Sequence, residues 1–252
     1  MSLSANSKAL LYGSGVFTTT AFAGGEPLLW EKHWRRLMRD AAKLGIDVSE
    51  HDEVSVYRAL AETIDRSGLT SGRARVSFAD GSAADLWPGG GDGNTSLSIL
   101  VGERRSVPVN LSLAISPHRV NTTSPLAGIK SCNYLEPILS LDEAKDRCFD
   151  EAIRLNERDE IASACMANLF WLSDGVLFTP SLQTGCLAGT TREHILENLE
   201  CEEVEAGIDA VREADEIFLT SAGLGIVQAA AFEGRPLGKR QHEIFDLFPR
   251  PA

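Results

Sequence analysis

The alternation of apolar and polar residues along the first half of the chain predicts two helices packed on a small sheet. Apolar residues recur at helical spacing over residues 31–44 and 51–67. The expected buried faces are Trp34, Leu37, Ala41 and Leu44 in the first helix, and Val54, Tyr57, Leu60 and Ile64 in the second. Runs rich in β-branched and aromatic residues predict strands at 12–23, 26–30, 73–78 and 96–101. The first two strands are expected to form a hairpin across Gly24-Gly25.

The second half of the chain is predicted to be richer in strands. A strand at 111–115 precedes a helix over 134–147, with Ile138, Leu141 and Ala144 facing inward. Further strands are expected at 151–155, 161–165, 168–172, 176–179, 202–205 and 216–220, a helix at 191–199, and a short helix plus a tail in the last ten residues. The glycine-rich segment 87–94 is expected to be a flexible loop. The mixed pattern indicates the α+β class.

Composition and charge narrow the range of partners. The 252 residues carry a formal net charge of −12, and such a mean field repels nucleic acids and anionic membranes. No apolar run approaches the roughly 20 residues that a membrane span needs, and the N-terminus lacks the layout of a signal peptide. The five cysteines form no CxxC pair and the five histidines lack metal-ligand spacing. We therefore expect a cytoplasmic protein with reduced thiols, without a metal site, a nucleic-acid partner or a membrane partner.

Lys130 differs from the other five lysines because its neighbours in the sequence are mostly uncharged. A lysine that is kept from full hydration loses part of its preference for the ammonium form. Its neutral amine can then attack a carbonyl carbon and form a Schiff base. The residues alone also fit a second interpretation, in which the lysine extends along an apolar surface from the start of a helix.

Three other segments carry candidate anion-binding groups. The glycine-rich turn before Thr190 and Thr191 opens into a helix, whose first N–H groups and hydroxyls suit a phosphate; an ordinary capped helix fits equally well. Arg36 can pair with a phosphate through two N–H groups, or it can belong to a solvated basic helix face. The loop at Ser221-Ala222 follows a strand, and its backbone N–H groups suit a carboxylate.

Together these segments resemble the class IV aminotransferases, which are pyridoxal 5'-phosphate (PLP) enzymes of fold type IV. That family includes branched-chain aminotransferases, D-amino-acid transaminases and 4-amino-4-deoxychorismate lyases. The resemblance extends from Tyr12 to about Gln228 and rests on a series of motifs in a fixed order. These motifs are Tyr12-Gly-Ser-Gly-Val-Phe, His33 with Arg36-Leu37, Lys130 with Asn133-Tyr134-Leu135, Ala167-Asn-Leu-Phe-Trp171, Thr179-Pro180, Gly189-Thr-Thr-Arg192 and Phe218-Leu-Thr-Ser221.

The resemblance implies a two-domain fold similar to that of D-amino-acid aminotransferase. We expect a small N-terminal α/β domain at residues 1–106, an interdomain linker at 107–123, and a larger strand-rich, PLP-binding domain at 124–252. The resemblance also implies a homodimer.

The resemblance implies a role for each candidate residue at the cofactor. Lys130 would form the Schiff base with PLP and later transfer the proton. Arg36, Thr190 and Thr191 would hold the cofactor phosphate, while Tyr134 would donate a hydrogen bond to the phenolic oxygen of the ring. Each role matches a physical need: an amine for covalent attachment, donors for the phosphate dianion and a phenol at the ring oxygen.

The chain departs from the family at the pyridine nitrogen. The family usually places a glutamate there, but the corresponding residue here is Ser163. Glu160 lies three positions earlier, an odd offset that points a side chain to the opposite face of a strand. A serine leaves the ring nitrogen unprotonated and the ring a weaker electron sink, which favours prompt loss of a leaving group. Asp80 also replaces an arginine that often precedes a glycine after the 73–78 strand, which weakens one route for binding an acidic substrate.

The leading functional hypothesis is a lyase that converts 4-amino-4-deoxychorismate to p-aminobenzoate and pyruvate, a step of folate synthesis. The stretch from Cys165 to Trp171 is more similar to the lyases, whereas Tyr134 is more similar to the branched-chain enzymes. The alternative is an aminotransferase acting on branched-chain or D-amino acids with a 2-oxo acid acceptor. A third hypothesis is a catalytically weak binding member of the family. In every case the partner is a small amino-acid-like molecule, and the backbone at Ser221 and Ala222 would receive its carboxylate.

Overall fold

The computed structural model describes residues 4–84, 94–238 and 241–248. The chain divides into two compact units, of which the first comprises Met1–Arg104 with Ile129–Tyr134. The second unit comprises Arg105–Gly128 with Leu135–Ala252. The loop expected at 87–94 lies, apart from its last residue, outside the described residues.

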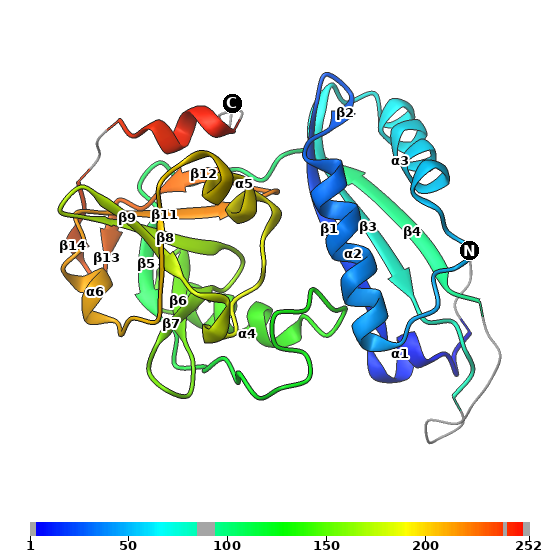
Figure 1. Ribbon diagram of the computed structural model, residues 1–252, viewed down its shortest axis with the longest axis horizontal. Coiled ribbons are helices and arrows are strands. Elements are labelled where there is room, and N and C mark those ends of the chain that lie inside the picture. Colours follow the sequence, from blue (N-terminus) through cyan, green and yellow to red (C-terminus); the bar gives the residue numbers. More distant parts are fainter. Residues whose placement is uncertain (1–3, 85–93, 239–240, 249–252) are drawn as a thin grey trace. The chain divides into compact units, whose positions relative to one another are not determined.

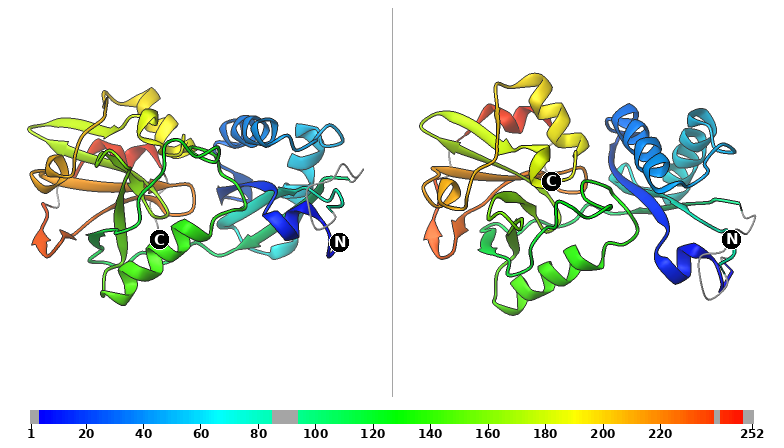
Figure 2. Two further views of the ribbon diagram at one scale, coloured as in Figure 1. Left: turned by 90° about the horizontal axis from the view of Figure 1, so that it is seen from below. Right: turned by 60° about the horizontal axis from the view of Figure 1, so that its bottom comes forward.

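The first unit is an antiparallel sheet with two helices on one face (Figure 1, Figure 2). Its elements are α1 (Lys8–Tyr12), β1 (Gly15–Ala23), β2 (Glu26–Pro27), α2 (Trp30–Leu44), α3 (Glu53–Ser67), β3 (Ser71–Ala79) and β4 (Ser96–Gly102). The strand order is β2-β1-β3-β4. The core lies between the sheet and the two helices, where Leu37, Leu60 and Ile64 pack against Val76 and Phe78.

Three expectations for this unit need correction. Tyr12 ends a short helix that Gly13 closes with a left-handed backbone (φ 66°), so the first strand starts only at Gly15. Trp30 does not end a strand but begins α2. Val54 is 67% exposed. The buried face of α3 instead carries Val56, Leu60 and Ile64, which recur every fourth residue.

The segment 129–134 joins the first unit through backbone hydrogen bonds to the start of β1. The Phe17 N–H donates to the Lys130 carbonyl at 3.0 Å, and the Cys132 N–H donates to the Gly15 carbonyl at 2.8 Å. Gly15 allows this approach, because a Cβ there would lie 2.9 Å from the Cys132 sulfur. The sequence places these six residues in the domain that starts at 124, so the observed division differs from the expected one in this segment.

The second unit consists of two five-stranded sheets around a shared apolar core (Figure 1). Its strands are β5 (Ser112–Ile115), β6 (Glu151–Leu155), β7 (Ile161–Ala164), β8 (Asn168–Ser173), β9 (Val176–Pro180), β10 (Glu202–Val204), β11 (Glu216–Ser221), β12 (Gly225–Gln228), β13 (Ala231–Phe232) and β14 (Arg235–Pro236). Its helices are α4 (Leu135–Asp146), η1 (Leu182–Thr184), α5 (Thr190–Asn198), α6 (Asp209–Arg212) and η2 (Glu243–Leu247). One sheet has the order β10-β9-β8-β11-β12 and the other β14-β13-β5-β6-β7.

The second unit contains elements that the sequence pattern did not predict. These are α6, the 3₁₀ helix η1 and strands β12, β13 and β14, which comprise two to four residues each. They are too short for a periodic signal. Ile138 is 41% exposed rather than inward, whereas Leu141 and Ala144 are buried as expected. The expected final helix corresponds to the 3₁₀ helix η2, and residues 249–252 lie outside the described part.

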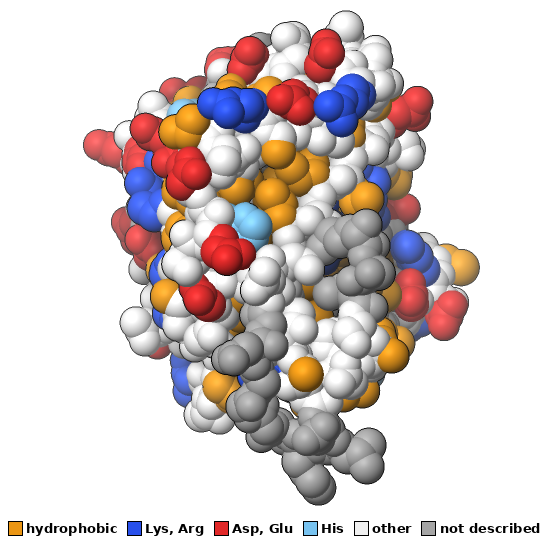
Figure 3. Space-filling view, turned by 90° about the vertical axis from the view of Figure 1, so that its right-hand side faces the viewer, with side chains coloured by type: hydrophobic (Ala, Val, Ile, Leu, Met, Phe, Trp, Pro, Cys, Tyr) orange, Lys and Arg blue, Asp and Glu red, His pale blue; other side chains and the backbone are white. Residues whose placement is uncertain are grey.

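The described helices and one face of the molecule can be compared with the expected charge and hydropathy. None of the described helices is long and apolar enough to cross a membrane. On the face in Figure 3, acidic and basic side chains are intermixed along the rim rather than gathered into a basic patch.

Candidate cofactor site

Lys130 lies beside β1 in the first unit, with its amine among aromatic rings. Its Nζ donates to the Tyr134 hydroxyl at 3.2 Å. The same nitrogen lies 4.6 Å from the ring centroid of Phe17 and 4.6 Å from that of Tyr134. The two rings meet edge to face, with centroids 5.1 Å apart. The fold therefore brings the amine of Lys130 and the phenol of Tyr134, both predicted from the sequence, within hydrogen-bond distance.

The surroundings of Lys130 make it a reactive amine at neutral pH. The pKa of Lys130 is lowered to about 7, chiefly by burial, since removal from water disfavours the ammonium form. The guanidinium groups of Arg36 and Arg75 contribute to this lowering, while the Asp40 carboxylate opposes it. Of the two interpretations of this lysine, the reactive one fits these surroundings better.

Arg36 is buried on α2, with only 6% of its surface exposed, so the alternative of a solvated basic face is wrong for this residue. Its Nη2 donates to the Thr18 hydroxyl oxygen at 2.8 Å. That oxygen also lies 2.6 Å from Nδ1 of the buried His33. An arginine can only donate, so the Thr18 oxygen is the acceptor of the bond from Arg36 and is shared with the His33 ring. Burial, with Arg36 and Lys130 nearby, lowers the pKa of His33 well below its usual value, so the ring is neutral.

Asp40 connects α2 to the Lys130 segment. One carboxylate oxygen accepts the Lys130 backbone N–H at 3.0 Å. The other oxygen accepts two N–H groups of Arg39, at 2.9 and 2.7 Å. Asp40 is 1% exposed and lies one helical turn after Arg36, so one buried helix face carries both the arginine and the group that holds the lysine backbone.

Arg75 is a functional candidate that sequence reasoning missed. Its guanidinium carbon lies 3.5 Å from the centroid of the Phe17 ring, the same ring that Lys130 approaches. Its charge is one of the causes that lower the pKa of Lys130. Pairing of β1 with β3 produces this neighbourhood, because Phe17 lies opposite Ser77 and Thr19 opposite Arg75. Such a neighbourhood follows from strand register and not from spacing along the chain.

The start of α5 in the second unit is built like an anion-binding turn. Gly189 caps the helix without a side-chain hydrogen bond. Thr190 and Thr191 follow it and are 2% and 1% exposed. The buried Thr191 hydroxyl has no hydrogen-bond partner among the described residues. A buried hydroxyl without a partner is costly in a folded protein, which favours a ligand at this turn over an ordinary capped helix.

A neighbouring strand adds a second hydroxyl of this kind. α5 packs against β11, and the buried Thr220 hydroxyl on β11 also has no partner among the described residues. The turn before α5 is fixed by Asn168, whose amide donates to the Leu187 carbonyl at 2.8 Å. A Cβ at Gly189 would lie 1.9 Å from the Asn168 side-chain oxygen, so a larger residue there would displace the Asn168 side chain.

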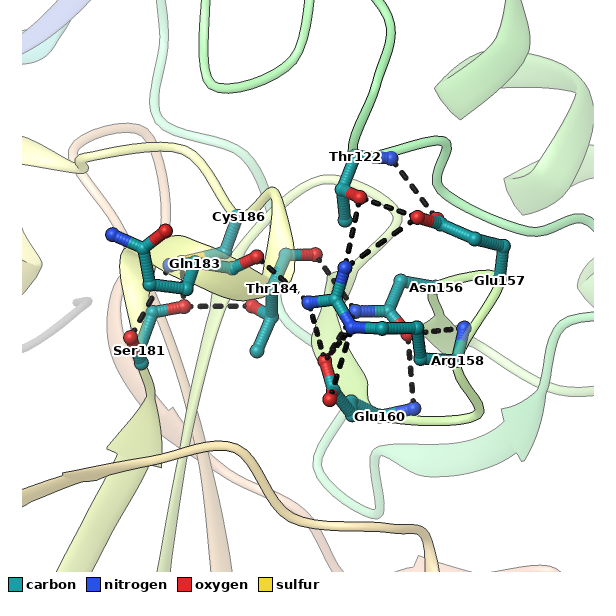
Figure 4. A network of polar contacts seen from close by, with 9 residues as sticks. All are labelled: Thr122, Asn156, Glu157, Arg158, Glu160, Ser181, Gln183, Thr184 and Cys186. Atoms are coloured by element: carbon teal, nitrogen blue, oxygen red, sulfur yellow. Dashed lines mark hydrogen bonds and ion pairs between the residues drawn. The ribbon is translucent and has the colours of Figure 1, made fainter.

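Ser163 lies half-buried on β7, and Glu160 does not replace the missing glutamate. The Glu160 carboxylate is bound by Arg158, with Nη2 at 2.7 Å, and by the Asn156 amide at 2.7 Å (Figure 4). Arg158 also donates to the Thr122 hydroxyl at 3.0 Å. Glu160 therefore belongs to a network that ties the turn between β6 and β7 to the loop at Thr122.

Ser221 and Ala222 lie where β11 turns into β12. The Ser221 hydroxyl and carbonyl oxygens each accept the Leu224 N–H at 3.2 Å, which closes the turn. Ser221 pairs with Gly225 across the hairpin. Their expected role in binding a carboxylate stays a prediction.

The described residues contain no group of three or more His, Cys, Asp or Glu side chains that could hold a metal ion. Comparison with known proteins identifies the family of the chain. The model of the family described as amino-transferase class IV matches residues 15–232. The aminodeoxychorismate lyase of Bacillus subtilis (strain 168) is 29% identical over 246 residues, covering 92% of this chain and 82% of the relative.

Two solved structures share the fold. The branched-chain aminotransferase from Thermoproteus uzoniensis, solved with norvaline, superposes with a TM-score of 0.87 at 26% identity, covering 98% of this chain and 86% of that one. The 4-amino-4-deoxychorismate lyase from Pseudomonas aeruginosa superposes with a TM-score of 0.80 at 25% identity, covering 95% and 91%. The two-unit α+β fold is thus the fold that the sequence predicted.

Proposed function

Because the chain belongs to the class IV aminotransferase family, we propose that it is a lyase that cleaves 4-amino-4-deoxychorismate to p-aminobenzoate and pyruvate. It is a PLP-dependent enzyme, as its family membership shows. The lyase assignment is supported by the Bacillus subtilis relative and by the serine on β7 where the family usually has a glutamate.

The residues present fit PLP. The carbonyl-reactive amine of Lys130 matches its aldehyde, and the unpartnered hydroxyls of Thr191 and Thr220 match its phosphate. We propose that Lys130 forms the covalent bond to the cofactor, that Arg36, Thr190 and Thr191 bind its phosphate, and that Tyr134 holds its phenolic oxygen. We also propose that Ser163 lies at its ring nitrogen. When bound, PLP supplies an electron sink for the carbon that carries the substrate amino group.

Lys130 is also the group that moves protons. With a pKa of about 7, its amine is partly neutral at physiological pH and can accept a proton as readily as it donates one. In the proposed reaction it takes the proton from the carbon bearing the amino group. The C–O bond to the enolpyruvyl group then breaks, and the departing enolpyruvate receives a proton to become pyruvate, while the six-membered ring becomes aromatic.

Arg75 offers a site for a substrate carboxylate. Asp80 occupies the position at which the family often has an arginine. Its carboxylate accepts hydrogen bonds from Ser14 and Ser82. Arg75 brings a positive charge close to Lys130. We propose that it attracts one of the two substrate carboxylates, while the Ser221-Ala222 backbone receives the other.

The alternative is an aminotransferase for branched-chain or D-amino acids, which the Tyr134 motif and the Thermoproteus structure support. An acceptor-dependence assay on PLP-loaded protein separates the two functions. The lyase releases pyruvate from 4-amino-4-deoxychorismate without any 2-oxo acid, whereas strict dependence on a 2-oxo acid identifies the aminotransferase. Failure to take up PLP contradicts both.

We further propose that the enzyme is a cytoplasmic homodimer. Apolar side chains on α4 support the dimer, because Leu135, Ile138 and Leu139 are 64%, 41% and 52% exposed. Exposed apolar residues grouped on one helix are typical of a protein interface. Light scattering after gel filtration tests the assignment, and a monomer at micromolar concentration contradicts it.

A further inference from the structure

Arg154 on β6 lies directly opposite Ser163 on β7 in the antiparallel pair. Opposite residues in such a pair project from the same face of the sheet, with Cβ atoms about 5 Å apart. The same register continues toward Cys165, whose N–H donates to the Ala152 carbonyl at 3.1 Å, and it shifts only between Arg154 and Leu155. A buried arginine therefore stands beside the serine that replaces the usual glutamate.

The Arg154 guanidinium is buried, and its positive charge is only partly neutralised by neighbouring groups. Its side chain is 6% exposed and forms an ion pair with Glu136, whose side chain is 64% exposed and therefore well screened by water. The Arg154 Nη2 also lies 3.4 Å from the Arg119 carbonyl oxygen. The Nε has no hydrogen-bond partner among the described residues. This face of β6 and β7 thus carries a net positive character.

The other carboxylates near these two strands do not cancel that charge. Glu151 lies an odd number of residues from Arg154 and accepts the backbone N–H groups of Ala152 and Cys165, at 3.1 and 2.9 Å. Burial raises the pKa of Glu151, so its charged form is disfavoured. Glu160 is bound by Arg158.

We propose that Arg154 and Ser163 together keep the ring nitrogen of PLP unprotonated. This inference rests on the proposed function, which places that nitrogen at Ser163. A nearby cation disfavours protonation of a basic nitrogen. The Ser163 hydroxyl is able to donate a hydrogen bond to its lone pair. Arg154 acts by its charge and Ser163 by direct contact.

The consequence is a cofactor suited to elimination. An unprotonated ring withdraws electrons less strongly, so negative charge on the substrate carbon is held only briefly. A substrate that expels a neighbouring leaving group at once tolerates this, whereas transfer of the amino group requires a second protonation at the cofactor. The Arg154–Ser163 pair therefore favours the lyase reaction over transamination.

The test uses the intact protein loaded with PLP labelled with ¹⁵N in the ring. We expect the ¹⁵N NMR signal of an unprotonated pyridine at neutral pH. Ser163→Glu should protonate the nitrogen, because Arg154 would keep the new carboxylate ionised. Arg154→Leu should raise the apparent pKa of the ring nitrogen by about 1–3 units, and Glu136 tolerates this loss because it is largely exposed.

The matched control is Arg147→Leu, which removes an exposed arginine on the same stretch of chain. Its ¹⁵N signal should match that of the unmodified protein. A protonated ring nitrogen in the unmodified protein at neutral pH overturns the inference. The inference also fails if the apparent pKa of the ring nitrogen in Arg154→Leu equals that in the Arg147→Leu control. Absence of PLP binding instead contradicts the proposed function, so the two failures are distinguishable.

Discussion

The polar centres of the two units differ in how their groups are satisfied. In the first unit, Lys130, Arg36 and Asp40 are held by hydrogen bonds to neighbouring residues. In the second unit, the buried hydroxyls of Thr191 and Thr220 have no partner among the described residues. Since buried polar groups nearly always have partners, the first centre is held in place largely by the protein itself, whereas the second has hydroxyls to which a ligand can bind.

The largest effect is expected at the amine of the first centre. Lys130→Ala should abolish covalent attachment of PLP and lower turnover by about 10²–10⁴-fold or more, because both the attachment point and the proton carrier are lost. Borohydride reduction followed by intact-mass measurement detects the attachment.

The control is Lys145→Ala on α4, an exposed lysine of the second unit. It should keep the mass increase after borohydride reduction. A mass increase of equal size in both variants contradicts the role of Lys130.

The next largest effect is expected where the Thr18 hydroxyl holds the Arg36 guanidinium in place. Thr18→Val removes the oxygen shared by Arg36 and His33. It should lower the free energy of unfolding by about 1–3 kcal/mol and weaken PLP binding, since two buried groups lose a partner. Urea unfolding of the cofactor-free protein and a PLP titration measure the two effects.

Thr18→Ser retains the hydroxyl and serves as the matched control. It should recover most of both losses. Equal behaviour of the serine and valine variants shows that the hydroxyl does not position Arg36.

A third prediction concerns pH. The rate of PLP attachment to cofactor-free protein should rise with pH around a midpoint near 7, because the neutral amine reacts and the pKa of Lys130 is about 7. Asp40→Asn removes a charge that raises this pKa, so the midpoint should fall, by at most about 1 unit.

Stopped-flow absorbance measures the rate across pH. Asp47→Asn removes an exposed carboxylate in the same unit and should leave the midpoint unchanged. A midpoint near the usual lysine value shows that the amine is not desolvated.

The sequence pointed to Lys130, Arg36 and Tyr134 more readily than to the residues that contact them. Spacing and the motif order identified Lys130, Arg36 and Tyr134, because these residues lie in recognisable segments. Thr18, Asp40 and Arg75 escaped notice because strand register and helix docking bring them to the site. No local pattern records such contacts.

The same difference holds for the fold: elements with a local sequence pattern were predicted, whereas elements that depend on pairing with distant segments were not. Long amphipathic elements such as α2 and α3 were predicted, apart from Trp30 and the exposed Val54. The two-residue strands β13 and β14 exist only because they pair with each other and because β13 pairs with β5. The position of Arg154 opposite Ser163 could not be predicted either, since it depends on the register of β6 and β7.

The smallest effect is expected from a comparison of two threonines in the second unit, one whose hydroxyl has a hydrogen-bond partner and one whose hydroxyl has none among the described residues. The Thr179 hydroxyl donates to the Leu169 carbonyl at 2.8 Å, whereas that of Thr191 has no partner among the described residues. Thr191→Val should leave the stability of the cofactor-free protein unchanged or slightly raised, and should weaken PLP binding by about 1 kcal/mol, roughly fivefold. Thr179→Val should lower stability by about 1 kcal/mol and leave PLP affinity unchanged.

Thermal unfolding without PLP and fluorescence titration with PLP measure the two quantities on both variants. The opposite responses follow from one principle, because a hydroxyl contributes to stability only in the state in which its partner is present. If Thr191→Val destabilises the cofactor-free protein as much as Thr179→Val does, the Thr191 hydroxyl has a protein partner. The start of α5 would then be a structural cap, and the phosphate would have to bind elsewhere.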